Sequence, residues 1–166
     1  MLYYAAYGSN LHLKQMSKRC PLSKPYVKLH FHNWQLVFKG VADLQKNKNS
    51  FVNMGIYKIT SECELSLDYY EDYPFLYKKK FIYREIMGEK IRIMMYIMKK
   101  KYEYSVPTVK YFNAIKKGYQ NWGLEKNLLL ESALHSIENN TSNGFKSRNW
   151  KDKNFIDEKF IKKIMT

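Results

Sequence analysis

The chain has 166 residues, 45% of them hydrophobic, which is enough for one domain with a buried core and excludes a disordered protein. No segment approaches the ~18 consecutive apolar residues that a membrane-spanning helix requires, so we expect no membrane partner. The formal net charge is +14, yet only four of the 29 cationic residues are arginine. This composition favours incidental charge over a nucleic-acid interface, with steering of an anionic small substrate as a third interpretation.

The first residues are apolar and lack the basic region of a signal peptide, so residues 2–7 are expected to form a buried strand. The strand breaks at Gly8, which lets the backbone bend sharply and approach a ligand closely. Ser9 and Asn10 are both good N-caps for a helix expected over residues 11–18. The free N–H groups at such a helix start attract carboxylates, although the same residues also suit an ordinary strand-to-helix turn.

Strands dominate the middle of the chain and helices its end. Apolar patterns predict strands, the first of them single or divided in two, over residues 26–38, 40–44, 51–59, 80–87 and 91–98. A polar turn is expected at 46–49 and a hairpin turn at Gly88. Helices are expected over 107–118 and 124–137. The pattern predicts an α+β fold, a small mixed β-barrel-like sheet with helices packed outside it.

The domain is expected to span residues 1–138, and residues 139–166 form a polar loop and a basic amphipathic tail whose role stays open. The two cysteines, Cys20 and Cys63, lie far apart and form no CxxC unit. A reduced, cytoplasmic setting therefore fits best. The sequence does not distinguish a monomer from a homodimer.

A further helix is expected over residues 61–71, where Ser61 and Glu64 have the spacing of a capping box. Four positions share one face by the i, i+4 rule: Cys63, Leu67, Tyr70 and Glu71. Since this stripe is mostly apolar, Glu71 is expected to turn toward the core near the helix C-terminus. Burial and the negative end of the helix dipole both raise the pKa of a carboxyl group, which suits a general base and acid. The alternative is a solvated glutamate at a frayed helix end.

The remaining candidates are less specific. Several tyrosines near the middle of the chain suit either a pocket wall or core packing: Tyr73, Tyr77, Tyr96, Tyr104 and Tyr111. His30 and His32 share one strand face but have no third ligand at a clear spacing, so no metal site is expected. The chain contains no Walker loop, GxSxG or HExxH motif.

Three segments are distinctive: YAAYGSNL at residues 4–11, FKGVADL at 38–44 and SLDYYEDYP at 66–74, followed by Tyr77. In this order they are similar to the YGSNL, FRGVADI-like and LDxxEGYPxxY segments of the γ-glutamylcyclotransferase family, also called AIG2-like. The resemblance extends over about residues 1–138 and includes the segments 15–21, 95–98 and 107–124. YGSN in place of YGSL sets the chain apart from the glutathione-specific sister group. Asp72 departs from the pattern, because glycine is commoner after the glutamate.

The resemblance implies a cofactor-independent enzyme that cyclises an L-γ-glutamyl amine or dipeptide to 5-oxoproline and releases the attached amine. It implies that Glu71 is the catalytic acid and base. The substrate-binding residues would be Tyr7, Gly8, Ser9, Asn10, Leu11, Tyr77, Tyr96 and Tyr111. Backbone N–H groups of residues 7–11 would hold either the substrate α-carboxylate or the oxyanion. The alternatives are a non-catalytic binding module on the same scaffold and a lysine-rich nucleic-acid-binding protein.

Overall fold

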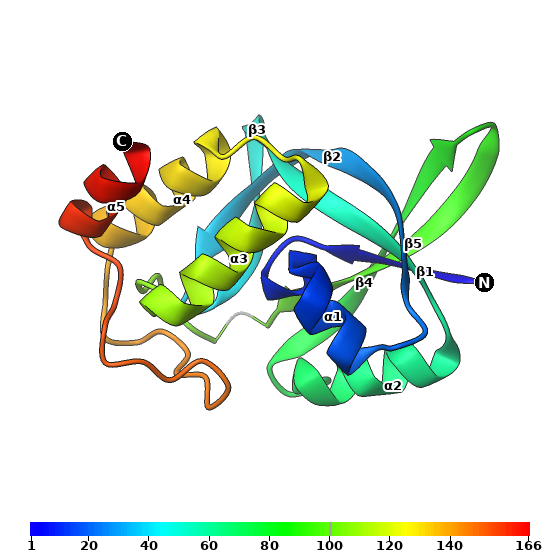
Figure 1. Cartoon of the computed structure of the whole chain (residues 1–166), viewed down its shortest axis with the longest axis horizontal. Helices are drawn as coiled ribbons and strands as arrows, with labels where there is room; N and C mark the ends of the chain where they lie inside the picture. The colour runs from blue at the N-terminus through cyan, green and yellow to red at the C-terminus, as the bar shows by residue number, and fades with distance from the viewer. Residues whose placement is uncertain (100) are drawn as a thin grey trace.

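The computed structural model describes residues 1–99 and 101–166. The strands are β1 (Leu2–Ala6), β2 (Lys24–Phe38), β3 (Ala42–Ile59), β4 (Tyr77–Ile86) and β5 (Glu89–Met98). The helices are α1 (Leu13–Arg19), α2 (Ser61–Tyr70), α3 (Val109–Trp122), α4 (Asn127–Glu138) and α5 (Glu158–Met165), and a short 3₁₀ turn, η1 (Ser9–Leu11), follows β1. The helices flank one mixed sheet, so the expected α+β class is confirmed (Figure 1).

The sheet has the strand order β2-β3-β1-β5-β4, with β1 at its centre. The β1–β5 pair is parallel and the other pairs are antiparallel. The sheet is not closed, which corrects the barrel-like expectation: β2 and β4 are its two edges. Side chains nevertheless reach between these edges. The Lys80 ammonium lies 5.4 Å from the Trp34 ring centroid, and the Arg84 guanidinium lies 5.4 Å from that of Phe31. Strong twist thus brings the edges together without joining their hydrogen bonds.

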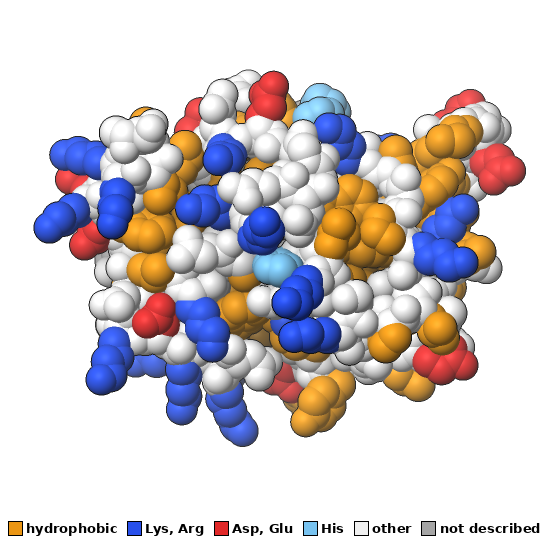
Figure 2. Space-filling view, viewed as in Figure 1, with side chains coloured by type: hydrophobic (Ala, Val, Ile, Leu, Met, Phe, Trp, Pro, Cys, Tyr) orange, Lys and Arg blue, Asp and Glu red, His pale blue; other side chains and the backbone are white. Residues whose placement is uncertain are grey.

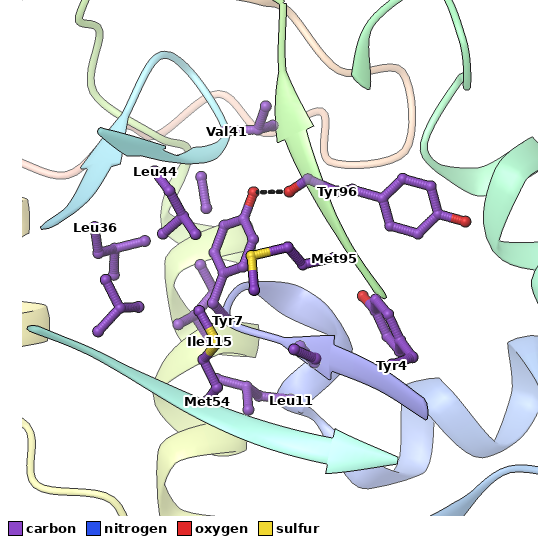
Figure 3. Close-up of a cluster of buried hydrophobic side chains, with 14 of the residues drawn as sticks. Tyr4, Tyr7, Leu11, Leu36, Val41, Leu44, Met54, Met95, Tyr96 and Ile115 are labelled. Atoms are coloured by element: carbon purple, nitrogen blue, oxygen red, sulfur yellow. Dashed lines mark hydrogen bonds between the residues drawn. The ribbon is translucent and has the colours of Figure 1, made fainter. Parts of the chain in front are cut away.

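The core that positions the site lies between the sheet and α3. Met54 of β3, Met95 of β5 and Ile115 of α3 are fully buried there, around the ring of Tyr7 (Figure 3). Close packing of α3 on η1 depends on Gly118, because a Cβ atom at that position would lie 2.5 Å from the Leu11 Cβ. The core therefore anchors the turn that carries Ser9 and Asn10.

Two local expectations were wrong at the start of the chain and in β3. The residues after Gly8 form η1, and α1 begins only after His12, whose side chain accepts the N–H of Gln15 as its cap. The polar turn expected at 46–49 is a bulge within one long strand. His32 pairs with Phe51 while Trp34 pairs with Lys46. The register shifts where Asn33 adopts a left-handed φ of 69°.

Two helix ends also differ from the expectation. Thr60, rather than Ser61, caps α2, and its side chain accepts the N–H of Cys63. The helix α3 does not end at Gly118 but continues to Gly123, which adopts the left-handed conformation typical of a helix terminus. A glycine inside a helix resembles a stop signal in the sequence, and only the packing against Leu11 explains its place.

Residues 139–166 pack along the rest of the chain. The N–H of Phe145 donates to the Lys39 carbonyl at 2.8 Å, and the N–H of Val109 donates to the Asn154 carbonyl at 2.9 Å. The helix α5 begins after its cap Asp157 and lies against α4 (Figure 1). In the described residues, no helix is long and apolar enough to cross a membrane.

Candidate functional site

A small cavity of about 50 Å³ lies where the end of β1, the turn η1 and the end of α2 meet. It brings together all the residues predicted as site residues except Leu11: Tyr7, Gly8, Ser9, Asn10, Glu71, Tyr77, Tyr96 and Tyr111. Leu11 instead lies in the core with its side chain fully buried, and its N–H donates to the Gly8 carbonyl. Tyr73 and Tyr104, grouped with these tyrosines from the sequence, lie outside the lining.

Glu71 immediately follows the last turn of α2, so its place depends on where that helix ends. Its carboxylate is half-buried, and its Oε1 accepts a hydrogen bond of 3.2 Å from the Asn10 side chain. Burial raises the pKa of Glu71 to about 7, against the opposing effect of the positive charge on Arg19. A carboxyl group that titrates near neutral pH can both accept and return a proton.

Asn10 orients Glu71 through hydrogen bonds of its side chain and of its backbone carbonyl. Its Nδ2 donates to Glu71 and, at 2.9 Å, to the Tyr4 hydroxyl, while its Oδ1 accepts from Arg19 at 2.6 Å. Its carbonyl accepts from the Tyr57 hydroxyl at 2.7 Å. Because these hydrogen bonds fix both the side-chain amide and the backbone carbonyl of Asn10, the side chain holds the Glu71 carboxylate in place. It does not cap a helix, which was its expected role.

Arg19 and Tyr4 are site residues that the sequence analysis did not single out. Arg19 closes the last turn of α1, and its guanidinium lies 3.6 Å from the Tyr70 ring centroid while also bonding Asn10 and Gln15. In the sequence it lies nine residues after Asn10, within the segment 15–21 that belongs to the family resemblance. The pairing depends on η1 turning the chain before α1 begins.

Six tyrosines line the cavity, Tyr4 and Tyr70 in addition to the four predicted ones. The hydroxyl groups of those four are all hydrogen-bonded within the protein, and that of Tyr96 donates to the Asp68 carboxylate at 2.6 Å. Tyr7 donates to the Tyr96 carbonyl at 2.6 Å (Figure 3). Tyr77 donates to the carbonyl of Ala42 at 2.6 Å, and Tyr111 accepts the N–H of the same residue at 2.9 Å. Burial raises the pKa of all four phenols well above the ordinary range. They stay protonated at neutral pH and shape the cavity, whereas the carboxyl group of Glu71 titrates near neutral pH.

The last wall comes from the C-terminal segment. Four residues of this segment line the cavity: Phe145, Ser147, Asn149 and Trp150. Trp150 is buried, and its Nε1 donates to the Tyr70 hydroxyl at 2.7 Å. The same hydroxyl lies 3.0 Å from the Ser9 Oγ, so one phenol links the C-terminal segment to η1. The isolated tryptophan in a polar run was the one sequence signal that could have shown this anchor.

Gly8 and the first two residues of η1, Ser9 and Asn10, line the same cavity. The N–H of Leu11 donates to Gly8 and that of His12 to Ser9, which closes the turn. The N–H groups of Ser9 and Asn10 precede these bonds and, as the first of a helical turn, have no acceptor within it. The absence of a side chain at Gly8 lets the backbone pack closely on Ala42 and Tyr111, since a Cβ there would lie 3.3 Å from both the Ala42 Cβ and the Tyr111 hydroxyl.

The histidine pair on β2 is not part of this site. The rings of His30 and His32 lie 6.2 Å apart, and each packs on Phe51. Over residues 1–99 and 101–166, no three His, Cys, Asp or Glu side chains converge as ligands of a metal ion would.

Comparisons with known proteins bear on the family and on the fold. The family described as "Gamma-glutamyl cyclotransferase, AIG2-like" matches residues 4–118, which include η1 and Glu71. No curated protein matches the chain.

Three solved structures are similar in fold. A structure titled "Gamma-glutamyl cyclotransferase" is 24% identical, with a TM-score of 0.69 over 98% of both chains. An uncharacterised protein from Homo sapiens is 23% identical, with a TM-score of 0.68 over 97% of this chain and 98% of the other. YkqA from Bacillus subtilis is 17% identical, with a TM-score of 0.69 over 85% of this chain and 56% of its own. The first two alignments include the C-terminal segment.

Proposed function

Because the chain belongs to the γ-glutamyl cyclotransferase, AIG2-like family, we propose that it converts an L-γ-glutamyl amine or dipeptide to 5-oxoproline and a free amine. The observation that carries this proposal is the half-buried Glu71, whose pKa of about 7 suits proton transfer at neutral pH. Nucleophile and electrophile belong to one substrate molecule, so a cavity with fixed walls can supply much of the acceleration by holding the substrate folded.

In the proposed reaction, ionised Glu71 takes a proton from the α-ammonium group of the substrate. The freed nitrogen attacks the γ-carbonyl carbon, and the carbon–nitrogen bond to the leaving amine then breaks. Over the whole reaction, the α-nitrogen gives up two protons and keeps one in the lactam. The leaving nitrogen gains both and departs as an ammonium ion. Glu71 relays these protons and ends the cycle ionised, as it began.

The N–H groups of Ser9 and Asn10 are the proposed hydrogen-bond donors for the substrate. They suit either the α-carboxylate or the oxyanion that develops on the γ-carbonyl oxygen. The hydroxyl groups of Tyr7, Tyr77 and Tyr111 bond backbone groups, and that of Tyr96 donates to the Asp68 carboxylate. These bonds support a role for the four tyrosines in shape rather than in charge stabilisation.

Glu71→Gln tests the assignment, because glutamine can still accept the hydrogen bond from Asn10 but cannot take a proton. We expect kcat/KM for 5-oxoproline release to fall by about 10²–10⁴-fold. The matched control is Asp72→Asn, which removes the neighbouring exposed carboxylate at a left-handed position that asparagine tolerates. We expect the control to keep its turnover.

The assay should cover a panel of γ-glutamyl amines and dipeptides, with the fold of each variant checked by circular dichroism. Near-normal turnover by folded Glu71→Gln would show that Glu71 does not move the proton. Tight retention of a γ-glutamyl compound without any product would instead identify a binding module.

A further inference from the structure

A second, larger hollow lies beside the Glu71 cavity. It is a groove of about 700 Å³ between the C-terminal segment and the residues around Gly40 and Ser105. This volume is within the range of small-molecule sites. The two hollows are adjacent, because Phe145, Ser147 and Trp150 line both of them.

The shape of the Glu71 cavity determines the direction in which a longer substrate extends. Its volume of about 50 Å³ is well below the ~150 Å³ of a cavity that holds benzene. On the sheet side it is closed by Tyr4, Tyr7 and Tyr96, which are buried. On the side of the C-terminal segment its lining includes Asn149, which is exposed. The part of a substrate that does not fit beside Glu71 therefore extends toward that segment and the groove behind it.

The charged side chains that line the groove are mostly positive. Three lysines of the C-terminal segment line it: Lys146, Lys151 and Lys153. Asp152 is the one acidic residue in the lining, and both its carboxylate oxygens accept backbone N–H groups, from Lys110 at 3.0 Å and from Asn154 at 3.1 Å. Lys and Arg side chains gather along the lower left edge of the molecule, over this segment (Figure 2).

The rest of the lining suits a polar organic group rather than an inorganic ion alone. Ser105 and Ser142 offer hydroxyl groups, and Val106 and Phe155 offer apolar surface. Asp152 supplies one negative charge against three lysines, and both its carboxylate oxygens already accept backbone N–H groups. The groove therefore keeps a net positive charge. A ligand with one or more carboxylates on a short carbon chain matches this combination.

We propose that this groove binds the leaving-amine portion of the substrate and that its three lysines select an amine that carries carboxylates. The inference rests on the proposed cyclotransferase function and adds the substrate class. The preferred substrates are γ-glutamyl conjugates of acidic amino acids. Each lysine–carboxylate contact is exposed, so selectivity arises from the sum of three modest attractions and weakens with salt.

Two nearly isosteric substrates test the charge requirement. γ-Glutamyl-aspartate and γ-glutamyl-asparagine differ by one carboxylate, and γ-glutamyl-isobutylamine has none on its leaving amine. We expect kcat/KM to decrease in that order. Substitution of Lys146, Lys151 and Lys153 by Gln together should lower kcat/KM for γ-glutamyl-aspartate about tenfold, with a much smaller loss for the neutral amine.

The matched control replaces three exposed lysines of α5, Lys159, Lys162 and Lys163, by Gln. Both triple variants lower the net charge equally, so general electrostatic steering would reduce both alike. An equal loss in the two variants, or a wild-type protein that turns over all three substrates equally, would overturn the inference while leaving the cyclotransferase function intact.

A binding measurement separates the two proposals when turnover fails. Dissociation constants for γ-glutamyl-aspartate and γ-glutamyl-asparagine can be measured by NMR titration on Glu71→Gln. If the wild type releases no product, the same titration can be carried out on the wild type. We expect tighter binding of the aspartate conjugate, lost in the groove variant and kept in the α5 variant. Absence of 5-oxoproline from every substrate would contradict the proposed function. Equal affinities for the two conjugates would contradict the role of the groove.

Discussion

Two features of its environment act in opposite directions on the pKa of Glu71. Partial burial disfavours the ionised carboxylate, while the Arg19 guanidinium, linked to it through Asn10, favours it. The balance leaves the pKa at about 7, so both protonation states are populated at neutral pH. A fully exposed glutamate would be a weaker base, and a more deeply buried one would not ionise.

The pH dependence of activity follows from this balance. Glu71 has to be ionised to accept the first proton, so we expect kcat/KM to rise with pH through about 7 and then level off. Arg19→Gln should move this rise to higher pH, since it removes the positive charge that favours the carboxylate. The pH–rate profiles of the two proteins measure the difference. A profile that is flat between pH 5 and 8 would exclude Glu71 as the titrating base.

The ionisation of Glu71 that raises activity with pH should lower the free energy of unfolding over the same pH range. The folded-state pKa is raised from 4.5 to about 7, so the native state binds the proton more tightly than the unfolded chain. The stabilising effect of protonation is fully present below about pH 4.5 and is lost as pH rises through 7. Glu71→Gln carries no charge, so it should be more stable than the wild type by up to about 3 kcal/mol at pH 8 and by about 1 kcal/mol or less at pH 5.

Urea unfolding of both proteins at the two pH values measures this gain. Asp72→Asn serves again as the control and should show no comparable gain, because Asp72 is exposed. A Glu71→Gln variant that is less stable than the wild type at pH 8 would show that the ionised carboxylate stabilises the fold.

At the scale of elements, the wall of the site depends on how the C-terminal segment docks beside the β2–β3 connection. Gly40 lies in that connection with a left-handed φ of 81°, and a Cβ there would lie 2.0 Å from the Phe145 carbonyl oxygen. The N–H of Gly40 donates to Ser105, and the neighbouring Lys39 carbonyl accepts from Phe145. Backbone contact between these segments thus brings Phe145 and Trp150 to the cavity.

Gly40→Ala should displace this wall. Gly88, in the β4–β5 turn, has nearly the same φ of 80° but no neighbour within 4 Å of a Cβ, so Gly88→Ala is a matched control for backbone strain. We expect Gly88→Ala to cost about 1 kcal/mol of stability and to keep its activity. Gly40→Ala should cost a further 1–3 kcal/mol or so and raise KM, because the wall moves away from the substrate. Equal effects on KM would show that the segment does not shape the site.

At the scale of the whole molecule, the positive charge is poorly compensated. In the described part of the chain, ion pairs within 4.0 Å engage only two lysines, Lys39 with Asp43 and Lys79 with Glu64 and Asp68. The formal net charge remains +14. Repulsion among the other cations opposes the compact state.

Salt should therefore stabilise the protein. We expect the midpoint of thermal unfolding to rise between about 0.02 and 0.5 M sodium chloride, because the Debye length falls over this range to less than the spacing of most surface charges. Calorimetry at pH 7 measures the shift. A midpoint that falls with added salt would show that attractive ion pairs outweigh the repulsion.

Much of the fold was determined by local sequence patterns. Period-two alternation and turn residues predicted strands that the structure contains, and Pro107 and Gly123 marked the starts of its two longest helices. Local patterns likewise predicted the helix before Pro74 and the mostly apolar face of that helix on which Glu71 lies. These features depend on neighbours a few residues away, which is why a sequence can specify them.

Only the tertiary structure decided how distant segments share one site. Trp150 bonds Tyr70 across 80 positions of the sequence, and Asn10 bonds Glu71 across 61. The same holds for Leu11, which belongs to the motif but packs into the core, and for the C-terminal segment, which lines the cavity. Such contacts follow from burial and hydrogen-bond satisfaction in the packed molecule, and no local pattern encodes which distant partner supplies them.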